Sequence, residues 1–190
     1  HGNDCVETEQ YARMMAIAEQ KTFISPYNDV DVLMGQGSIA IELLKDCPDL
    51  DAVFVSMGGG GLISGIGAAL QGLRPEVEII GVSPIQSPAL HECIKAGKVI
   101  DVTCYDTWSD ATAGGVEPGA ITVDIASQVV DRSLLVPEKE IKQAMVDLIE
   151  SQKMLVEGAA GLALAGFRQV AREFKGRKTA VVICGGNIGI

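Results

Sequence analysis

The chain has 190 residues, a formal net charge of −10, 22 glycines and only 4% aromatic residues. No cluster of Lys and Arg interleaved with aromatic residues occurs, so we expect no nucleic-acid partner and no anionic lipid partner. No apolar run reaches the roughly 20 residues that span a bilayer, and the first residues lack the pattern of a signal peptide, so a soluble protein is predicted.

The first part of the chain shows a helix pattern followed by strand patterns. Residues 7–20 have apolar side chains at helical spacing, and residues 22–25 form a short predicted strand that Pro26 ends. A second helix is predicted at 36–45. A continuous apolar run at 52–57 is too short for most helices and predicts a buried parallel strand.

The alternation continues to the end of the chain without a linker, charge block or repeat that marks a domain boundary. A small-residue helix at 62–73 and a strand at 78–82 complete a βαβ unit. Further elements are helices at 88–96, 122–130, 137–152 and 158–174, and a strand at 179–184. This order predicts an α/β fold with three layers, in which helices cover both faces of a mostly parallel sheet.

Four consecutive glycines, Gly58, Gly59, Gly60 and Gly61, lie between a predicted buried strand and a predicted helix. Backbone N–H groups at such a helix start can bind a phosphate without any lysine, and glycine lets the main chain approach the anion closely. Neither G-x-G-x-x-G nor G-x-x-x-x-G-K-[ST] can be placed here, which favours a phosphate smaller than a dinucleotide or nucleoside triphosphate. The alternative is that the glycines serve only tight packing of helix against strand.

Cysteine and histidine usage argues against disulfide, zinc and hydrolase sites. The five cysteines are far apart, with no C-x-x-C pair and an odd total, which fits a reducing, cytoplasmic compartment. They are Cys5, Cys47, Cys93, Cys104 and Cys184. The histidines are His1 and His91, and His91 is interpreted as a helix-surface residue because it lies in an amphipathic stretch without a G-x-S-x-G motif.

Four motifs carry a resemblance that covers most of the chain. In chain order they are GQGS from Gly35, VSMGGGGLISG from Val55, VEGAAG from Val156 and CGGN from Cys184. With these motifs the chain resembles the carboxy-terminal portion of the fold-type II pyridoxal-phosphate enzymes, the threonine and serine dehydratases and serine racemases. The resemblance implies pyridoxal 5'-phosphate as cofactor, a small-molecule amino acid as substrate and a homodimer.

The same resemblance assigns cofactor-binding roles to individual residues. The backbone amides of the glycine loop and of Leu62 are expected to hold the cofactor phosphate. Cys184 matches the position beside the pyridine nitrogen, with a plain buried strand-end thiol as the alternative. Since a thiol has a reference pKa of about 8.5, it would not keep that nitrogen protonated as a carboxylate would, which suits loss of a β-hydroxyl better than transamination.

Two more residues are assigned with less distinctive motifs. Glu157 is expected to face the cofactor ring, and the alternative is a simple helix cap. Gly115, within Gly114-Gly115-Val116, matches a glycine segment that brings main chain next to the bound substrate.

Two motifs of the family do not occur in this sequence. They are the S-x-K-x-R-G-like motif with the Schiff-base lysine and the S-S-G-N-H-G-like loop that binds the substrate carboxylate. We therefore expect a fragment, roughly the last three-fifths of a family member, with no catalytic residue of its own and no activity alone. Residues 1–21 would end the small domain, and 22–190 would form the carboxy-terminal part of the large cofactor-binding domain.

The sequence favours one function but leaves others open. Residues 83–89 contain no carboxylate, so no metal site of the racemase type is predicted and a dehydratase is favoured. The leading hypothesis is a parent threonine or serine ammonia-lyase, which converts a hydroxy amino acid to a 2-oxo acid and ammonia. The alternatives are a serine racemase-like enzyme, a β-replacement enzyme, and a non-catalytic anion-binding α/β module.

Overall fold

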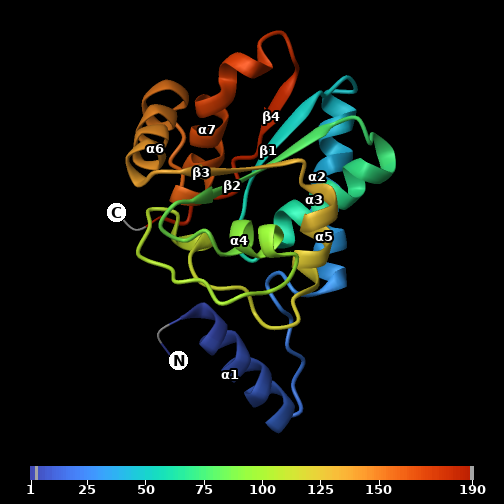
Figure 1. Cartoon of the computed structure of the whole chain (residues 1–190), viewed down its shortest axis with the longest axis vertical. Helices are drawn as coiled ribbons and strands as arrows, with labels where there is room; N and C mark the ends of the chain where they lie inside the picture. Colours follow the sequence, from blue (N-terminus) through green and yellow to red (C-terminus); the bar gives the residue numbers. More distant parts are fainter. Residues whose placement is uncertain (3, 189–190) are drawn as a thin grey trace.

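A parallel β-sheet forms the centre of the computed structural model, which describes residues 1–2 and 4–188 (Figure 1). Its strands are β1 (Ala52–Ser56), β2 (Glu78–Pro84), β3 (Arg132–Val136) and β4 (Thr179–Val181). They lie in the order β3-β2-β1-β4, and every pairing is parallel. The predicted α/β class with a parallel sheet is confirmed.

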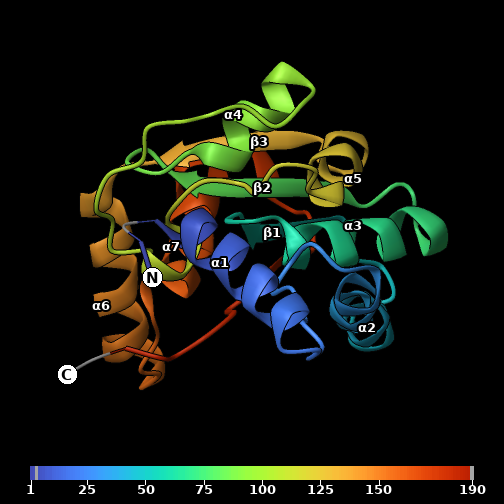
Figure 2. The ribbon, with the colours of Figure 1, turned by 90° about the horizontal axis from the view of Figure 1, so that it is seen from below.

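Helices cover both faces of this sheet. One face carries α2 (Val30–Asp46), α3 (Gly61–Leu73), α4 (Ala89–Ala96) and α5 (Ile121–Val129), and the other carries α6 (Glu138–Gln152) and α7 (Gly158–Val170). Figure 2 shows α2 and α6 at opposite sides of the molecule. The first helix, α1 (Cys5–Ala18), lies apart from the sheet, next to the long segment between α4 and α5. Among the described residues, no helix combines the length and apolar character needed to cross a membrane.

Strand β1 is fully buried because helices cover both of its faces. Its side chains alternate between the faces. Val53 and Val55 pack in the core cluster on the α3 side, and Phe54 packs in the cluster on the α7 side. There the Phe54 ring makes edge-on contacts with Phe167 and Phe174, at centroid distances of 5.3 and 5.2 Å. A strand buried on both faces requires the continuous apolar run that predicted it.

One predicted strand is absent, one observed strand was not predicted, and one strand ends early. Residues 22–25 form no strand, because no other strand lies beside them, and Ser25 instead accepts a hydrogen bond from the amide of Asn28. Strand β3 was not predicted, since its Arg132-Ser133 start is polar and only its last residue, Val136, is buried. The last strand ends at Val181 rather than at residue 184.

Other boundaries shift for identifiable reasons. Helix α2 begins at Val30, well before the predicted residue 36, because the Asp29 side chain caps it by accepting from the amides of Asp31 and Val32. The helix predicted at 158–174 ends at Val170 and continues as a 3₁₀ turn, η2 (Ala171–Phe174).

The prediction that His91 lies on a helix surface was wrong. Its side chain is buried between α4 and β3, where Nδ1 lies 2.6 Å from Ser133 Oγ. Since β3 was not predicted, the face of α4 that carries His91 had no expected partner.

Candidate functional site

The four glycines form a loop at the carboxyl end of β1, where ligands bind in open parallel sheets. Gly60 has a left-handed backbone, with φ of +93°, and immediately precedes α3. Within the described part of the chain, the N–H groups of Gly58 to Gly61 and of Leu62 make no hydrogen bond. These five residues line a cavity of about 350 Å³. The loop therefore presents free donors to a cavity at the positive end of a helix dipole.

Packing also demands glycine at each position of this loop. A Cβ on Gly59 would lie 2.5 Å from Cγ of the Tyr27 ring, and one on Gly61 would lie 2.9 Å from Tyr27 Cα. A Cβ on Gly58 would lie 2.9 Å from Thr112 Cα. The alternative interpretation thus has a structural basis, but it does not compete with anion binding, because the side-chain positions face protein while the amides stay unpaired.

Cys184 lines the same cavity, just after β4. The residue is exposed, so the alternative of a plain buried thiol was wrong. Shielding by the surrounding protein, followed by the charge of Glu157, raises the pKa of the Cys184 thiol to about 11. The thiol is therefore protonated at neutral pH.

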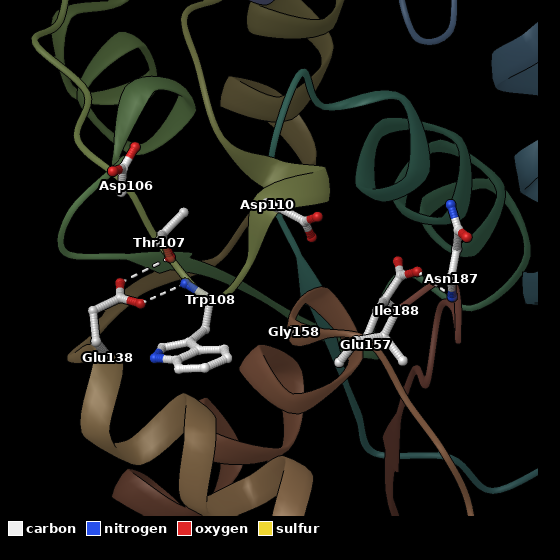
Figure 3. A pocket seen from close by; sticks show the side chains of 9 residues that line it. All are labelled: Asp106, Thr107, Trp108, Asp110, Glu138, Glu157, Gly158, Asn187 and Ile188. Carbon is white, nitrogen blue, oxygen red and sulfur yellow. Dashed lines mark hydrogen bonds between the residues drawn. The ribbon is translucent and has the colours of Figure 1, made fainter. Parts of the chain in front are cut away.

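Glu157 occupies the position before the first residue of α7, but its side chain does not cap the helix. Its Oε2 accepts from the amide of Asn187 at 2.8 Å, and its own amide donates to the carbonyl of Gly185 at 3.1 Å. The helix-cap alternative was therefore wrong for the side chain. In Figure 3 the carboxylate and Asn187 lie side by side at the edge of a cavity.

Gly115 lies where α1 approaches the cavity. Gly114, which has φ of +99°, donates its N–H to Ser87 Oγ at 3.0 Å. A Cβ on Gly115 would lie 3.2 Å from Val6 Cγ2 on α1. Gly115 lines the cavity of the glycine loop, so all the site residues predicted from the sequence meet there.

A second cavity of about 420 Å³ adjoins the first, and no motif in the sequence predicted it (Figure 3). Asp110 and Glu157 line both cavities. Trp108 lines the second one, and Glu138 holds the Trp108 segment by accepting from its amide at 2.7 Å. Asp110 begins a short 3₁₀ helix, η1 (Asp110–Thr112), within the long segment between α4 and α5, and such connecting segments often carry functional residues.

These observations define an α/β protein in which a loop of unpaired amides opens onto a cavity that also contains a carboxylate and a thiol. The chain belongs to the pyridoxal-phosphate dependent enzyme family, whose model matches residues 1–186. Pyridoxal phosphate is the cofactor of this family.

The chain is similar to individual threonine ammonia-lyases and serine racemases. Over 184 residues the chain is 36% identical to an L-threonine ammonia-lyase of Thermotoga maritima, covering 96% of this chain and 45% of that protein. Among solved structures, threonine deaminase isoform 2 from Solanum lycopersicum superposes with a TM-score of 0.89 at 25% identity, covering 95% of this chain and 53% of that one. Maize serine racemase gives a TM-score of 0.87 at 26% identity, covering 96% and 57%. The chain thus spans about half the length of the curated relatives it matches.

Proposed function

We propose that this chain is the cofactor-binding part of a threonine or serine ammonia-lyase, which converts a hydroxy amino acid to a 2-oxo acid and ammonia. The observation that carries the proposal is the set of five unpaired amides at Gly58 to Leu62, in a chain similar to a threonine ammonia-lyase. When bound, the cofactor supplies a sink for the electron pair left at the substrate α-carbon. The protein must bind the cofactor phosphate and set the surroundings of the cofactor ring.

The glycine loop would hold the cofactor phosphate. Its five N–H groups match the acceptor oxygens of a phosphate, and the start of α3 adds the favourable end of a helix dipole. Because the whole chain carries a net charge of −10, this local donor cluster is what would make an anion bind here.

Cys184 and Glu157 would set the environment of the cofactor ring. With its pKa raised to about 11, the Cys184 thiol would offer the ring nitrogen a neutral partner rather than a counter-charge. A ring without a fixed counter-charge is the weaker electron sink, which favours loss of a β-hydroxyl over transamination. Glu157, whose carboxylate accepts a hydrogen bond from the Asn187 amide, would lie beside the ring.

We further propose that the chain has no activity alone. No lysine lies in an S-x-K-x-R-G-like motif, and none in the described part of the chain lines either cavity. Covalent attachment of the cofactor would then depend on a segment not contained in this sequence, with residues 1–21 ending the small domain and 22–190 belonging to the large one. A cytoplasmic homodimer remains part of the proposal.

The test separates binding from turnover. The chain is titrated with pyridoxal 5'-phosphate, treated with borohydride and analysed by mass spectrometry, and assayed with threonine for 2-oxobutanoate. We expect saturable binding, no stoichiometric covalent adduct and no turnover, whereas the protein completed by a lysine-bearing segment should form the adduct and release the 2-oxo acid. Absence of saturable binding overturns the cofactor assignment, and turnover by the chain alone overturns the proposed inactivity.

The missing lysine also favours a second candidate, a non-catalytic anion-binding module. That function predicts that inorganic phosphate competes with pyridoxal phosphate at equal concentration, because only the phosphate would be recognised. A strong preference for the whole cofactor argues for the enzyme. In the completed protein, conversion of L-serine to D-serine without ammonia release would instead identify a racemase.

A further inference from the structure

Tyr27 lies directly behind the glycine loop. It belongs to the segment between α1 and α2, yet it is only 8% exposed. Its ring fills the space beside Gly59, where a Cβ would come within 2.7 Å of Cε1, and its backbone fills the space beside Gly61. Because these atoms are in close contact, the loop cannot move toward Tyr27 unless the ring moves first.

The Tyr27 hydroxyl is held from two sides. It donates to Oε2 of Glu9 on α1 at 3.0 Å and accepts from the amide of Glu117 at 2.9 Å. Burial raises the pKa of Tyr27, so the hydroxyl keeps the proton that it donates. The two hydrogen bonds fix the far end of the ring, while the near end contacts the glycines.

Helix α1 makes several polar contacts with the rest of the molecule. It contains no buried residue. Arg13 pairs with Glu117, which is 4% exposed, at 3.1 Å, and Cys5 Sγ lies 3.5 Å from the carbonyl of Ala113. Two of the contacts of α1 are linked through Glu117. Arg13 pairs with the Glu117 carboxylate, and the Tyr27 hydroxyl, which donates to Glu9, accepts from the Glu117 amide. The position of α1 therefore depends on a few contacts.

We propose that Tyr27 is a positioning residue that sets the shape of the glycine loop and makes that shape depend on the placement of α1. The ring supports Gly59 and Gly61, and the hydroxyl ties the ring to Glu9 and Glu117. The inference rests on the proposed function in one respect: the ligand of the loop is taken to be the cofactor phosphate. Displacing α1 would then weaken phosphate binding although α1 donates no hydrogen bond to it.

The test compares variants that differ by single contacts. Tyr27→Phe keeps the ring and removes both hydrogen bonds, Glu9→Ala removes one acceptor, and Glu9→Gln removes the charge but keeps an acceptor. Tyr105→Phe is the control, because Tyr105 is 63% exposed and its hydroxyl makes no hydrogen bond within the described residues. Each variant is titrated with pyridoxal 5'-phosphate, and the order of the four glycine amides is measured by ¹⁵N relaxation.

We expect Tyr27→Phe to raise Kd about 3- to 10-fold, the range that one hydrogen bond commonly contributes, and to lower the order of the glycine amides. Glu9→Ala should lower the order less, Glu9→Gln should restore it, and Tyr105→Phe should leave Kd and order within twofold of the unmodified chain. Combining Tyr27→Phe with Glu9→Ala should add little, because both remove one linkage.

The two readouts separate this inference from the proposed function. If the unmodified chain binds no pyridoxal phosphate but amide order still depends on the Tyr27 hydroxyl, the proposed function fails and the positioning role stands. If the chain binds the cofactor and Tyr27→Phe changes neither Kd nor order, the positioning role is overturned.

Discussion

Replacing Gly59 by alanine tests whether the glycine loop must be free of side chains. The added Cβ would lie 2.5 Å from Cγ and 2.7 Å from Cε1 of Tyr27, about 1 Å closer than ordinary carbon contacts. The ring cannot swing away cheaply, because Glu9 and Glu117 hold its hydroxyl. Either the loop or the ring must therefore move.

The expected cost follows from this overlap. Overpacking a close-packed site typically costs about 1–3 kcal/mol, and the two-sided anchoring of Tyr27 places Gly59→Ala at the upper end, near ~3 kcal/mol. Urea unfolding followed by circular dichroism measures this loss. Because the loop is displaced, the affinity for pyridoxal phosphate should fall by at least about tenfold, an amount equal to ~1.4 kcal/mol.

Gly72→Ala provides a matched control in the chain itself. Gly72 lies in α3, and a Cβ there would meet nothing within 4 Å. Alanine should stabilise the helix at this position by about 0.5–1 kcal/mol and leave cofactor binding unchanged. The reasoning is refuted if Gly59→Ala unfolds at the same urea concentration as the unmodified chain and binds the cofactor equally well.

Three further predictions concern other residues. Gly60→Ala should cost about 1–2 kcal/mol in urea unfolding, because φ of +93° is strained for a residue with a Cβ, and an unchanged midpoint would contradict this. The rate of Cys184 alkylation by iodoacetamide, followed by mass spectrometry, should keep rising toward pH 11, and a plateau near pH 8.5 would argue against the raised pKa. Burial lowers the pKa of His91 below 6.5, so the unfolded chain binds more protons and the free energy of unfolding should fall as pH drops through 6.5 toward the folded pKa; His91→Gln should flatten that slope.

The sequence predicted the central βαβ unit well because its pattern is local. Strand β1 is a continuous apolar run, and glycines and Pro75 separate the next elements, so boundaries there differ by only a few residues from those observed. Strand β3 could not be predicted in this way. Four of its five residues are only partly buried, its place in the sheet depends on pairing with β2, and its first residues, Arg132 and Ser133, are polar.

The residues of the candidate site also fall into those that the sequence predicted and those that it did not. The glycine loop was predicted from local chemistry, whereas Glu157 and Cys184 were predicted from motifs of the family that the chain resembles. Tyr27, which contacts the glycine loop, and Asp110, which lines both cavities, belong to no such motif, because only the fold brings them beside the loop and the cavities. Tertiary placement of single side chains in irregular segments is the part that local patterns could not supply.

The position of β4 has a consequence for how the chain acquires its shape. The edge strand β4 pairs Thr179 with Ala52 of β1, so this pairing joins residues that lie far apart in the sequence. Contacts between such distant residues form slowly, because a long loop must close before they contribute. Until then β1 has an unpaired edge next to the glycine loop, and an unpaired edge can pair with a wrong strand. A ligand that binds the completed loop would favour the correctly paired sheet by mass action.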